Sequence, residues 1–224
     1  MTRKSVGIAS VLIVATMLAA AVVAGTSLPD DVQLPVHWGA DGEPDDFAGK
    51  WPALLLPSGV IAAVSMLFWF IPALEPRQEG LQRSQGLYLW GWIGMLMTGP
   101  AIQLSVLSVA FDWGIPVNHL IIGVIGLLLV MIGNQLGKSR RMYLIGLRTP
   151  RTLASEEVWI RTHRLAGKLL VAAGLVMVAA ALLPVPAGLL TPVTIAAVAV
   201  SAIVPILYSF LLWRREQAAG QARE

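Results

Sequence analysis

The stretch from Leu169 to Trp213 contains no charged residue, which is typical of a segment embedded in a membrane. Crossing the ~30 Å hydrocarbon core of a bilayer takes ~20 helical residues, so this stretch is long enough for two crossings. Pro184, Pro186 and Gly188 interrupt its middle, where proline and glycine favour a turn over a continuous helix. The sequence therefore predicts two membrane-spanning helices joined by a tight turn.

Earlier uncharged runs predict further spans. They extend over Val6 to Gly25, Ala53 to Leu74, Leu87 to Phe111 and Leu120 to Leu136. The chain is 56% hydrophobic and 13% charged, whereas soluble proteins have about 25% charged residues. We predict an all-α integral membrane protein with six transmembrane helices. The first run is longer than the apolar core of a signal peptide, so we expect an uncleaved anchor.

The basic residues predict the orientation of these helices. If both termini are cytoplasmic, every Lys and Arg of the 16 in the chain except Lys50 lies on the cytoplasmic side. The positive-inside rule selects this topology. It places an acidic group outside, namely Asp30, Asp31, Asp41, Glu43, Asp45, Asp46 and Asp112. Because loop orientation accounts for the basic charge, we expect no direct contact with nucleic acid.

Residues 137–168, the signature segment, form the largest polar insertion between the apolar runs. Pro150 disfavours a helix at Thr149, and Ser155 can cap a helix that begins with Glu156 and Glu157 at the positive end of its dipole. Glu157 and Arg161 have the i,i+4 spacing of a helical ion pair. We expect this helix to continue into the fifth span and to carry Glu156, Trp159 and His163 on one face.

Two interpretations of the signature segment remain open. Trp and basic residues at a span end commonly anchor a helix among lipid headgroups. Alternatively, so dense a polar segment in an apolar chain is a binding site for a partner. The sequence motifs of common hydrolases and phosphate-binding loops are lacking, and we predict no enzyme. Ion-coupled transport is disfavoured because Gln103, Asn134 and Gln135 are the notable polar groups within the spans.

The outer segment from Thr26 to Pro52 is rich in Pro, Gly and Asp and is predicted to be dominated by turns. His37 with Asp41, Glu43 and Asp45 offers ligands for a divalent ion, yet the Gly and final Glu of a calcium-binding EF-hand loop are missing. We predict a solvated acidic loop without metal. The chain has no cysteine, which excludes disulfides and thiolate sites, and we expect no cofactor.

Two motifs resemble those of a known family. The residues Asn134 to Lys138, Tyr143 and Gly146 to Leu170 resemble the signature of the SdpI-type membrane immunity proteins. Upstream, Leu34 to Asp45 resembles the extracytoplasmic motif of the DUF1648-like domain often found ahead of it. The resemblance implies an N-terminal region at residues 1–86, with two spans, and an SdpI-like region at residues 87–224, with four. The chain departs from the family pattern at Arg151, usually Trp, and at Gly137, often Pro.

The resemblance also implies a function. Such a protein resides in the bacterial plasma membrane, gives immunity to an antimicrobial peptide toxin, and can hold a small ArsR-like repressor at the membrane. A small-solute transporter or a membrane enzyme is the alternative. The partner-binding residues it implies are Asn134, Gly146, Arg148, Thr149, Pro150, Glu156, Glu157, Trp159, Arg161, His163 and Arg164. Its extracytoplasmic motif corresponds to Pro35, His37, Trp38, Gly42, Pro44 and Asp45.

Overall fold

The computed structural model describes residues 1–39 and 42–221, and within them six helices are long and apolar enough to cross a membrane. These helices are α1 (Arg3–Ser27), α2 (Lys50–Leu74), α4 (Gln85–Ala110), α5 (Val117–Leu136), α7 (Glu156–Leu182) and α8 (Ala187–Gln221). They coincide with the six predicted spans, and a short turn separates α7 from α8 as expected. Two short helices complete the helical part, α3 (Gln78–Arg83) and α6 (Pro150–Ala154).

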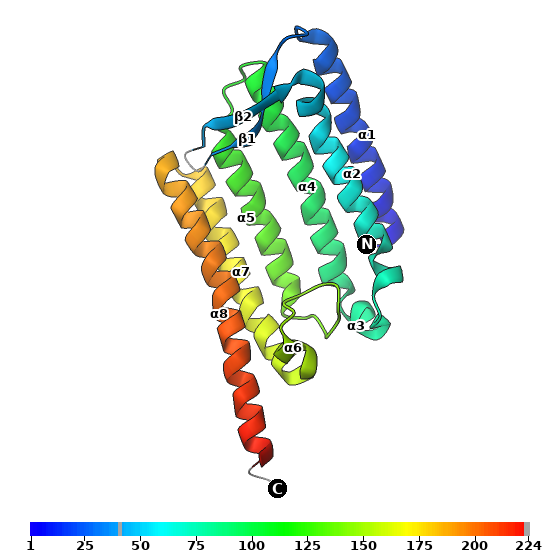
Figure 1. Ribbon diagram of the computed structural model, residues 1–224, viewed down its shortest axis with the longest axis vertical. Coiled ribbons are helices and arrows are strands. Elements are labelled where there is room, and N and C mark those ends of the chain that lie inside the picture. Colours follow the sequence, from blue (N-terminus) through cyan, green and yellow to red (C-terminus); the bar gives the residue numbers. More distant parts are fainter. Residues whose placement is uncertain (40–41, 222–224) are drawn as a thin grey trace.

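The long helices form two groups that meet where α4 packs on α5 (Figure 1). In the first group α1, α2 and α4 pack on one another, and in the second α7 packs on both α5 and α8. Helices α5 and α7 approach closely at Gly126 and Gly174. A Cβ added to Gly126 would lie 2.8 Å from the Gly174 carbonyl oxygen, so a larger residue would push the backbones apart.

The two ends of the bundle differ. At one end, the hairpin end, strands β1 (Gln33–Trp38) and β2 (Pro44–Gly49) form an antiparallel pair between α1 and α2. The other end, the loop end, carries α3, α6 and the signature segment (Figure 1). Both chain termini lie toward the loop end, and the last turns of α8 extend past the other helices (Figure 1).

The hairpin corrects the prediction that the outer segment consists of turns. Leu34 belongs to a buried cluster with Leu54 and Val106, and Val36 and Trp38, which follow it at alternate positions, pack against this cluster. Because strand side chains point alternately to opposite faces, this alternation was a usable signal for a strand. Pro35 within the run argued against it, since proline cannot donate to a strand ladder.

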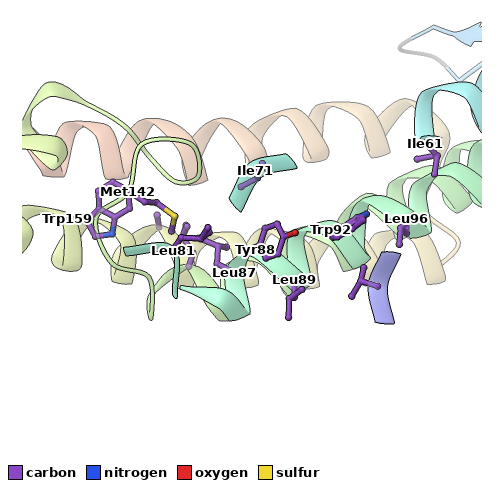
Figure 2. Packing of buried hydrophobic residues seen from close by; sticks show 13 residues of the cluster. Ile61, Ile71, Leu81, Leu87, Tyr88, Leu89, Trp92, Leu96, Met142 and Trp159 are labelled. Carbon is purple, nitrogen blue, oxygen red and sulfur yellow. The ribbon is translucent and has the colours of Figure 1, made fainter. Parts of the chain in front are cut away.

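A second cluster of buried apolar residues fills the loop half of the bundle (Figure 2). Trp92 of α4 stacks against Phe68 of α2, with ring centroids 5.9 Å apart. The same cluster extends to Met142 and Trp159, both fully buried, in the signature segment. The signature segment is therefore part of the core that joins the two helix groups, and its position depends on contacts with α2 and α4.

Candidate functional site

Two helix caps shape the signature segment. The Thr149 hydroxyl accepts from the Thr152 N–H at 3.1 Å and the Thr152 hydroxyl accepts from the Thr149 N–H at 2.9 Å, which starts α6. The Ser155 hydroxyl accepts from the Val158 N–H at 3.2 Å and starts α7. Such side chains satisfy N–H groups that have no partner within the helix. The predicted Ser155 cap is confirmed, whereas α6, which begins at Pro150, was not predicted.

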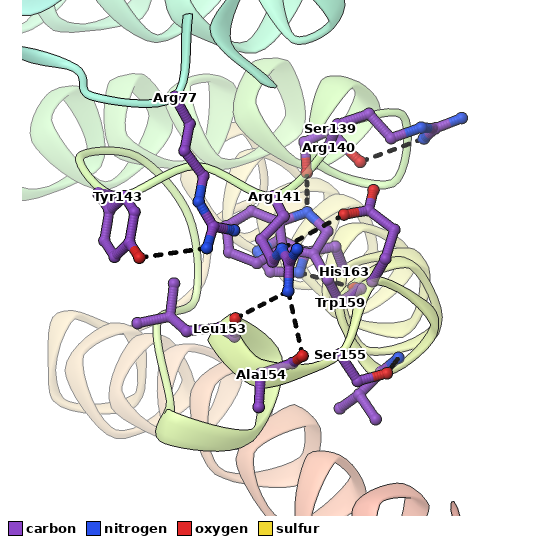
Figure 3. A network of polar contacts seen from close by, with 12 residues as sticks. Arg77, Ser139, Arg140, Arg141, Tyr143, Leu153, Ala154, Ser155, Trp159 and His163 are labelled. Carbon is purple, nitrogen blue, oxygen red and sulfur yellow. Dashed lines mark hydrogen bonds and ion pairs between the residues drawn. The ribbon is translucent and has the colours of Figure 1, made fainter. Parts of the chain in front are cut away.

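Trp159 and His163 form the buried centre of the segment. Both are 0% exposed, and their rings stack with centroids 3.9 Å apart (Figure 3). Trp159 Nε1 donates to the Ser139 hydroxyl at 3.3 Å. The interpretation of Trp159 as an anchor among lipid headgroups is therefore wrong. Its face of α7 turns inward, and the indole fixes the loop that precedes α6.

His163 holds the same loop through one ring nitrogen and contacts its own helix α7 through the other. Nε2 accepts from the Leu147 N–H at 2.9 Å, and Nδ1 lies 2.9 Å from the Trp159 carbonyl oxygen. A nitrogen that accepts an N–H carries no proton, so these partners correspond to the neutral ring with its proton on Nδ1. Gly146, with φ of +117°, lies against the two rings, and an added Cβ would be 2.8 Å from His163 Nε2. This close approach requires glycine at position 146.

Glu75, at the end of α2, is the strongest feature that sequence reasoning missed. Its side chain is 2% exposed. One carboxylate oxygen accepts from the N–H groups of Arg77 at 3.0 Å and Tyr143 at 2.9 Å. The other accepts from the Leu144 N–H at 2.7 Å. We call this arrangement the Glu75 clasp. It ties the end of α2 directly to the signature segment.

Two arginines, Arg77 and Arg141, make further contacts with the signature segment (Figure 3). The Arg77 guanidinium lies 4.5 Å above the Tyr143 ring and donates to the Tyr143 hydroxyl at 3.1 Å. Arg141 donates to the carbonyl oxygens of Leu153 at 3.0 Å and Ala154 at 3.1 Å, where α6 ends. A guanidinium at a helix C-terminus satisfies carbonyls and complements the helix dipole.

Helix α8 contacts the signature segment from the opposite side. The Arg151 guanidinium lies 4.6 Å from the Phe210 ring, and the Ser155 hydroxyl bonds to the Glu216 carboxylate at 2.9 Å. Arg151 stands where the resembling family usually has Trp, and here its planar cation stacks on an aromatic ring of α8.

A polar cleft of about 580 Å³ opens at the loop end between α3, the signature segment and the start of α7. Its basic lining consists of Arg77, Arg83, Arg140 and Arg141. Glu79 and Glu156 also line it, and each pairs with an arginine, at 2.7 Å to Arg83 and 3.6 Å to Arg141 respectively. We call it the arginine cleft. Its positive excess suits an anionic group or an acidic peptide segment.

The predicted signature residues thus divide by location. Thr149, Trp159 and His163 build the segment from within, and Glu156 lines the arginine cleft. The other predicted residues of the segment that are exposed are Arg148, Pro150, Glu157, Arg161 and Arg164. The predicted Glu157–Arg161 pair is present at 2.6 Å. Asn134 does not join this group, since it is exposed on α5 and lines a small hollow with Trp90.

At the hairpin end, the predicted motif residues lie on one hairpin. Trp38 pairs with Pro44, and Pro35 pairs with Phe47. His37 Nδ1 lies 2.5 Å from an oxygen of Asp45, and both side chains are more than half exposed. Gly42, with φ of +87°, packs so tightly on Asn118 of α5 that an added Cβ would clash with it.

His37, Glu43 and Asp45, three of the four candidate metal ligands, lie among the described residues of the hairpin. Within residues 1–39 and 42–221, no group of three or more His, Asp and Glu residues is close enough together to hold an ion. Asp41, one of the candidate ligands, lies outside the described residues.

Lys50, the basic residue predicted to lie outside, is nearly buried. Its ammonium donates to the Leu28 carbonyl oxygen at 3.0 Å and to the Asp30 carboxylate at 2.7 Å. That hydrogen bond, together with the positive charge, lowers the pKa of Asp30 from its usual 3.8. Lys50 therefore fastens the segment between α1 and β1 to the start of α2.

Comparisons with known proteins agree with the sequence resemblance. Residues 138–209 match the SdpI/YfhL protein family, and residues 11–62 match a domain of unknown function, DUF1648. The chain is 29% identical over 171 residues to "Immunity protein SdpI" of Bacillus subtilis (strain 168), which covers 75% of this chain and 77% of that protein. No solved structure matches the chain.

The two matched regions contain different parts of the molecule. The DUF1648 match contains the hairpin and most of α1, and the SdpI/YfhL match contains the signature segment, α6 and α7. Together with the six apolar helices, these matches support a multi-pass bacterial membrane protein that is similar to DUF1648 over residues 11–62 and to the SdpI/YfhL family over residues 138–209.

Proposed function

We propose that this chain is a membrane immunity protein that meets a peptide toxin at its hairpin end and binds a cytoplasmic protein partner at its loop end. The Glu75 clasp is the observation that carries the proposal. Helix α2 begins directly after the hairpin and ends at Glu75, whose carboxylate holds the backbone of the signature segment. A displacement of α2 by a ligand at the hairpin would therefore act directly on the signature segment.

The charge distribution supports the assignment of the two ends. Only Lys50 of the 16 basic residues belongs to the hairpin side of the sequence, so the positive-inside rule places the loop end in the cytoplasm. Carboxylates gather around the hairpin end, including Asp30, Asp31, Asp45 and Asp46. An acidic surface attracts basic peptides over a range set by salt.

The arginine cleft is the proposed docking site for an acidic segment of the cytoplasmic partner, such as an ArsR-like repressor. Arg140 is the best probe, because among the described residues its guanidinium bonds to the carbonyl oxygens of Lys138 and Ser139 and to no neighbouring helix. We expect Arg140→Glu to weaken recruitment of the partner to the membrane. Lys138→Glu is the matched control, since Lys138 is exposed just after α5, does not line the cleft and is not among the implied partner-binding residues.

The immunity function is tested by expressing the chain in a toxin-sensitive bacterium and exposing it to the toxin of the related immunity system. Survival above that of cells with an empty vector supports the proposal, provided that immunoblots show the protein in the membrane. Neutralising Glu43, Asp45 and Asp46 to amides should reduce protection most at low salt. Unchanged protection at low salt contradicts electrostatic capture by the hairpin.

Two other functions would give different results. A transporter would move a solute into liposomes that contain the purified protein, and a membrane enzyme would release a hydrolysed peptide or lipid. Neither result is expected here. Either activity, without protection of the sensitive cells, would replace the immunity proposal.

A further inference from the structure

A cleft between α1, α2 and α4 opens sideways in the loop half of the bundle. Its volume is about 530 Å³, within the range of small-molecule sites. The lining is almost entirely apolar and includes Val14 and Leu18 of α1, Ala62 and Met66 of α2, and Trp92 of α4. Met66 is 63% exposed, so the cleft faces the surroundings of the bundle, which in a membrane are lipid chains.

Hydrogen-bond donors without partners lie in this apolar cleft. Trp92 is 1% exposed and Ser65 is 8% exposed, both line the cleft, and neither Trp92 Nε1 nor the Ser65 hydroxyl has a partner among the described residues. A buried polar group without a partner is costly, and the hydrocarbon region offers no water to supply one. The pair therefore calls for a ligand that brings acceptor oxygens into an apolar cavity.

A cation lies at the mouth of the same cleft. The Arg3 guanidinium stacks 4.2 Å above the ring of Trp69, which lines the cleft, and Arg3 Nε is also buried without a partner. Lys4 is exposed beside it. The helix rises 1.5 Å per residue, so Arg3 lies roughly 10 Å along α1 from Ser10, a residue of the inner lining. The cleft thus has a cationic mouth and an interior with donors.

We propose that this cleft binds one anionic phospholipid from the leaflet at the loop end. Arg3 would contact the phosphate, one acyl chain would fill the apolar cleft, and an ester carbonyl would accept from Ser65 or Trp92. A phospholipid ester supplies acceptors without donors, which complements the unpaired N–H and O–H groups, and its phosphate complements the guanidinium. This inference does not depend on the immunity function.

Native mass spectrometry of the full chain, purified in mild detergent with equal amounts of phosphatidylglycerol and phosphatidylcholine, tests the proposal. We expect one phosphatidylglycerol to be retained per chain in preference to phosphatidylcholine. Arg3→Gln should reduce that preference about fivefold, the effect of one basic residue near an anionic headgroup. Trp92→Phe, which keeps an aromatic side chain and removes the N–H donor, should also weaken retention.

Filling the cleft provides the matched comparison. Ala62 lines the cleft, whereas its neighbour Ala63 is exposed and does not. Ala62→Phe should abolish retention and Ala63→Phe should leave it unchanged, with thermal unfolding confirming that both variants are folded. Equal retention of the two lipids by the parent would overturn the proposal. Equal lipid retention by the two phenylalanine variants would also overturn it. A parent dimer that Ala62→Phe dissociates would overturn it as well, because a second copy of the chain would then occupy the cleft.

Discussion

Replacing Glu75 by alanine would remove the acceptor for three backbone N–H groups, those of Arg77, Tyr143 and Leu144. A buried donor left unpaired costs about 1–3 kcal/mol. The side chains of Tyr143 and Leu144 are exposed, so water can reach this part of the loop once it opens. We therefore take the lower value and expect the closed loop to lose about 3 kcal/mol in Glu75→Ala.

The isosteric change Glu75→Gln separates hydrogen bonding from packing. An amide keeps the volume and one acceptor oxygen, but its NH₂ group must face at least one N–H donor. We expect a loss of about 1–1.5 kcal/mol, corresponding to one disrupted bond. If packing alone held the loop, this variant would behave as the parent.

Hydrogen exchange of the peptide that contains Tyr143 and Leu144 measures the effect, because local opening of the loop controls exchange of these amides. Since 1.36 kcal/mol changes an equilibrium constant tenfold, a loss of about 3 kcal/mol accelerates exchange roughly 150-fold. Glu79→Ala is the control. Its side chain is 77% exposed and, among the described residues, pairs with Arg83 on the surface, where such a pair contributes about 0–1 kcal/mol. Exchange that rises no more in Glu75→Ala than in Glu79→Ala would refute the clasp.

Three further predictions concern the helices, the loop and the hairpin end. Gly146→Ala should destabilise the signature segment by about 1–3 kcal/mol, because residues other than glycine are strained at its positive φ. Hydrogen exchange of the loop amides should be faster than in the parent, and an unchanged exchange rate would contradict the prediction. Gly174→Ala should lower the unfolding free energy by about 1–3 kcal/mol because its Cβ would meet a backbone oxygen at 2.4 Å, whereas Gly59→Ala, with open space around it, should not. The lowered pKa of Asp30 means that its pairing with Lys50 stabilises the fold above the unfolded pKa of about 3.9 and is lost as pH falls through the folded pKa. Thermal unfolding from pH 3 to 7 should therefore show an acid-sensitive contribution in the parent that Asp30→Asn lacks.

Sequence alone determined the features that depend on neighbouring residues. An uncharged run of sufficient length must cross the bilayer as a helix, because every backbone polar group has to be satisfied within the segment. Helix starts are equally local, since Ser155 bonds an N–H three residues away and Glu157 pairs with Arg161 one turn later. The resemblance of two short motifs then indicated the family, which the comparisons support.

Only the tertiary structure decided what the signature residues contact. Trp159 and His163 could equally have faced lipid, a partner or the core, because periodicity places them on one face of α7 without specifying what covers it. The clasp joins Glu75 to residues nearly seventy positions later, and no local pattern marks a carboxylate at a helix end as a partner for a distant backbone. Burial in a largely apolar protein leaves such polar groups few partners, so the packing of α2 against the signature segment determines which bonds form.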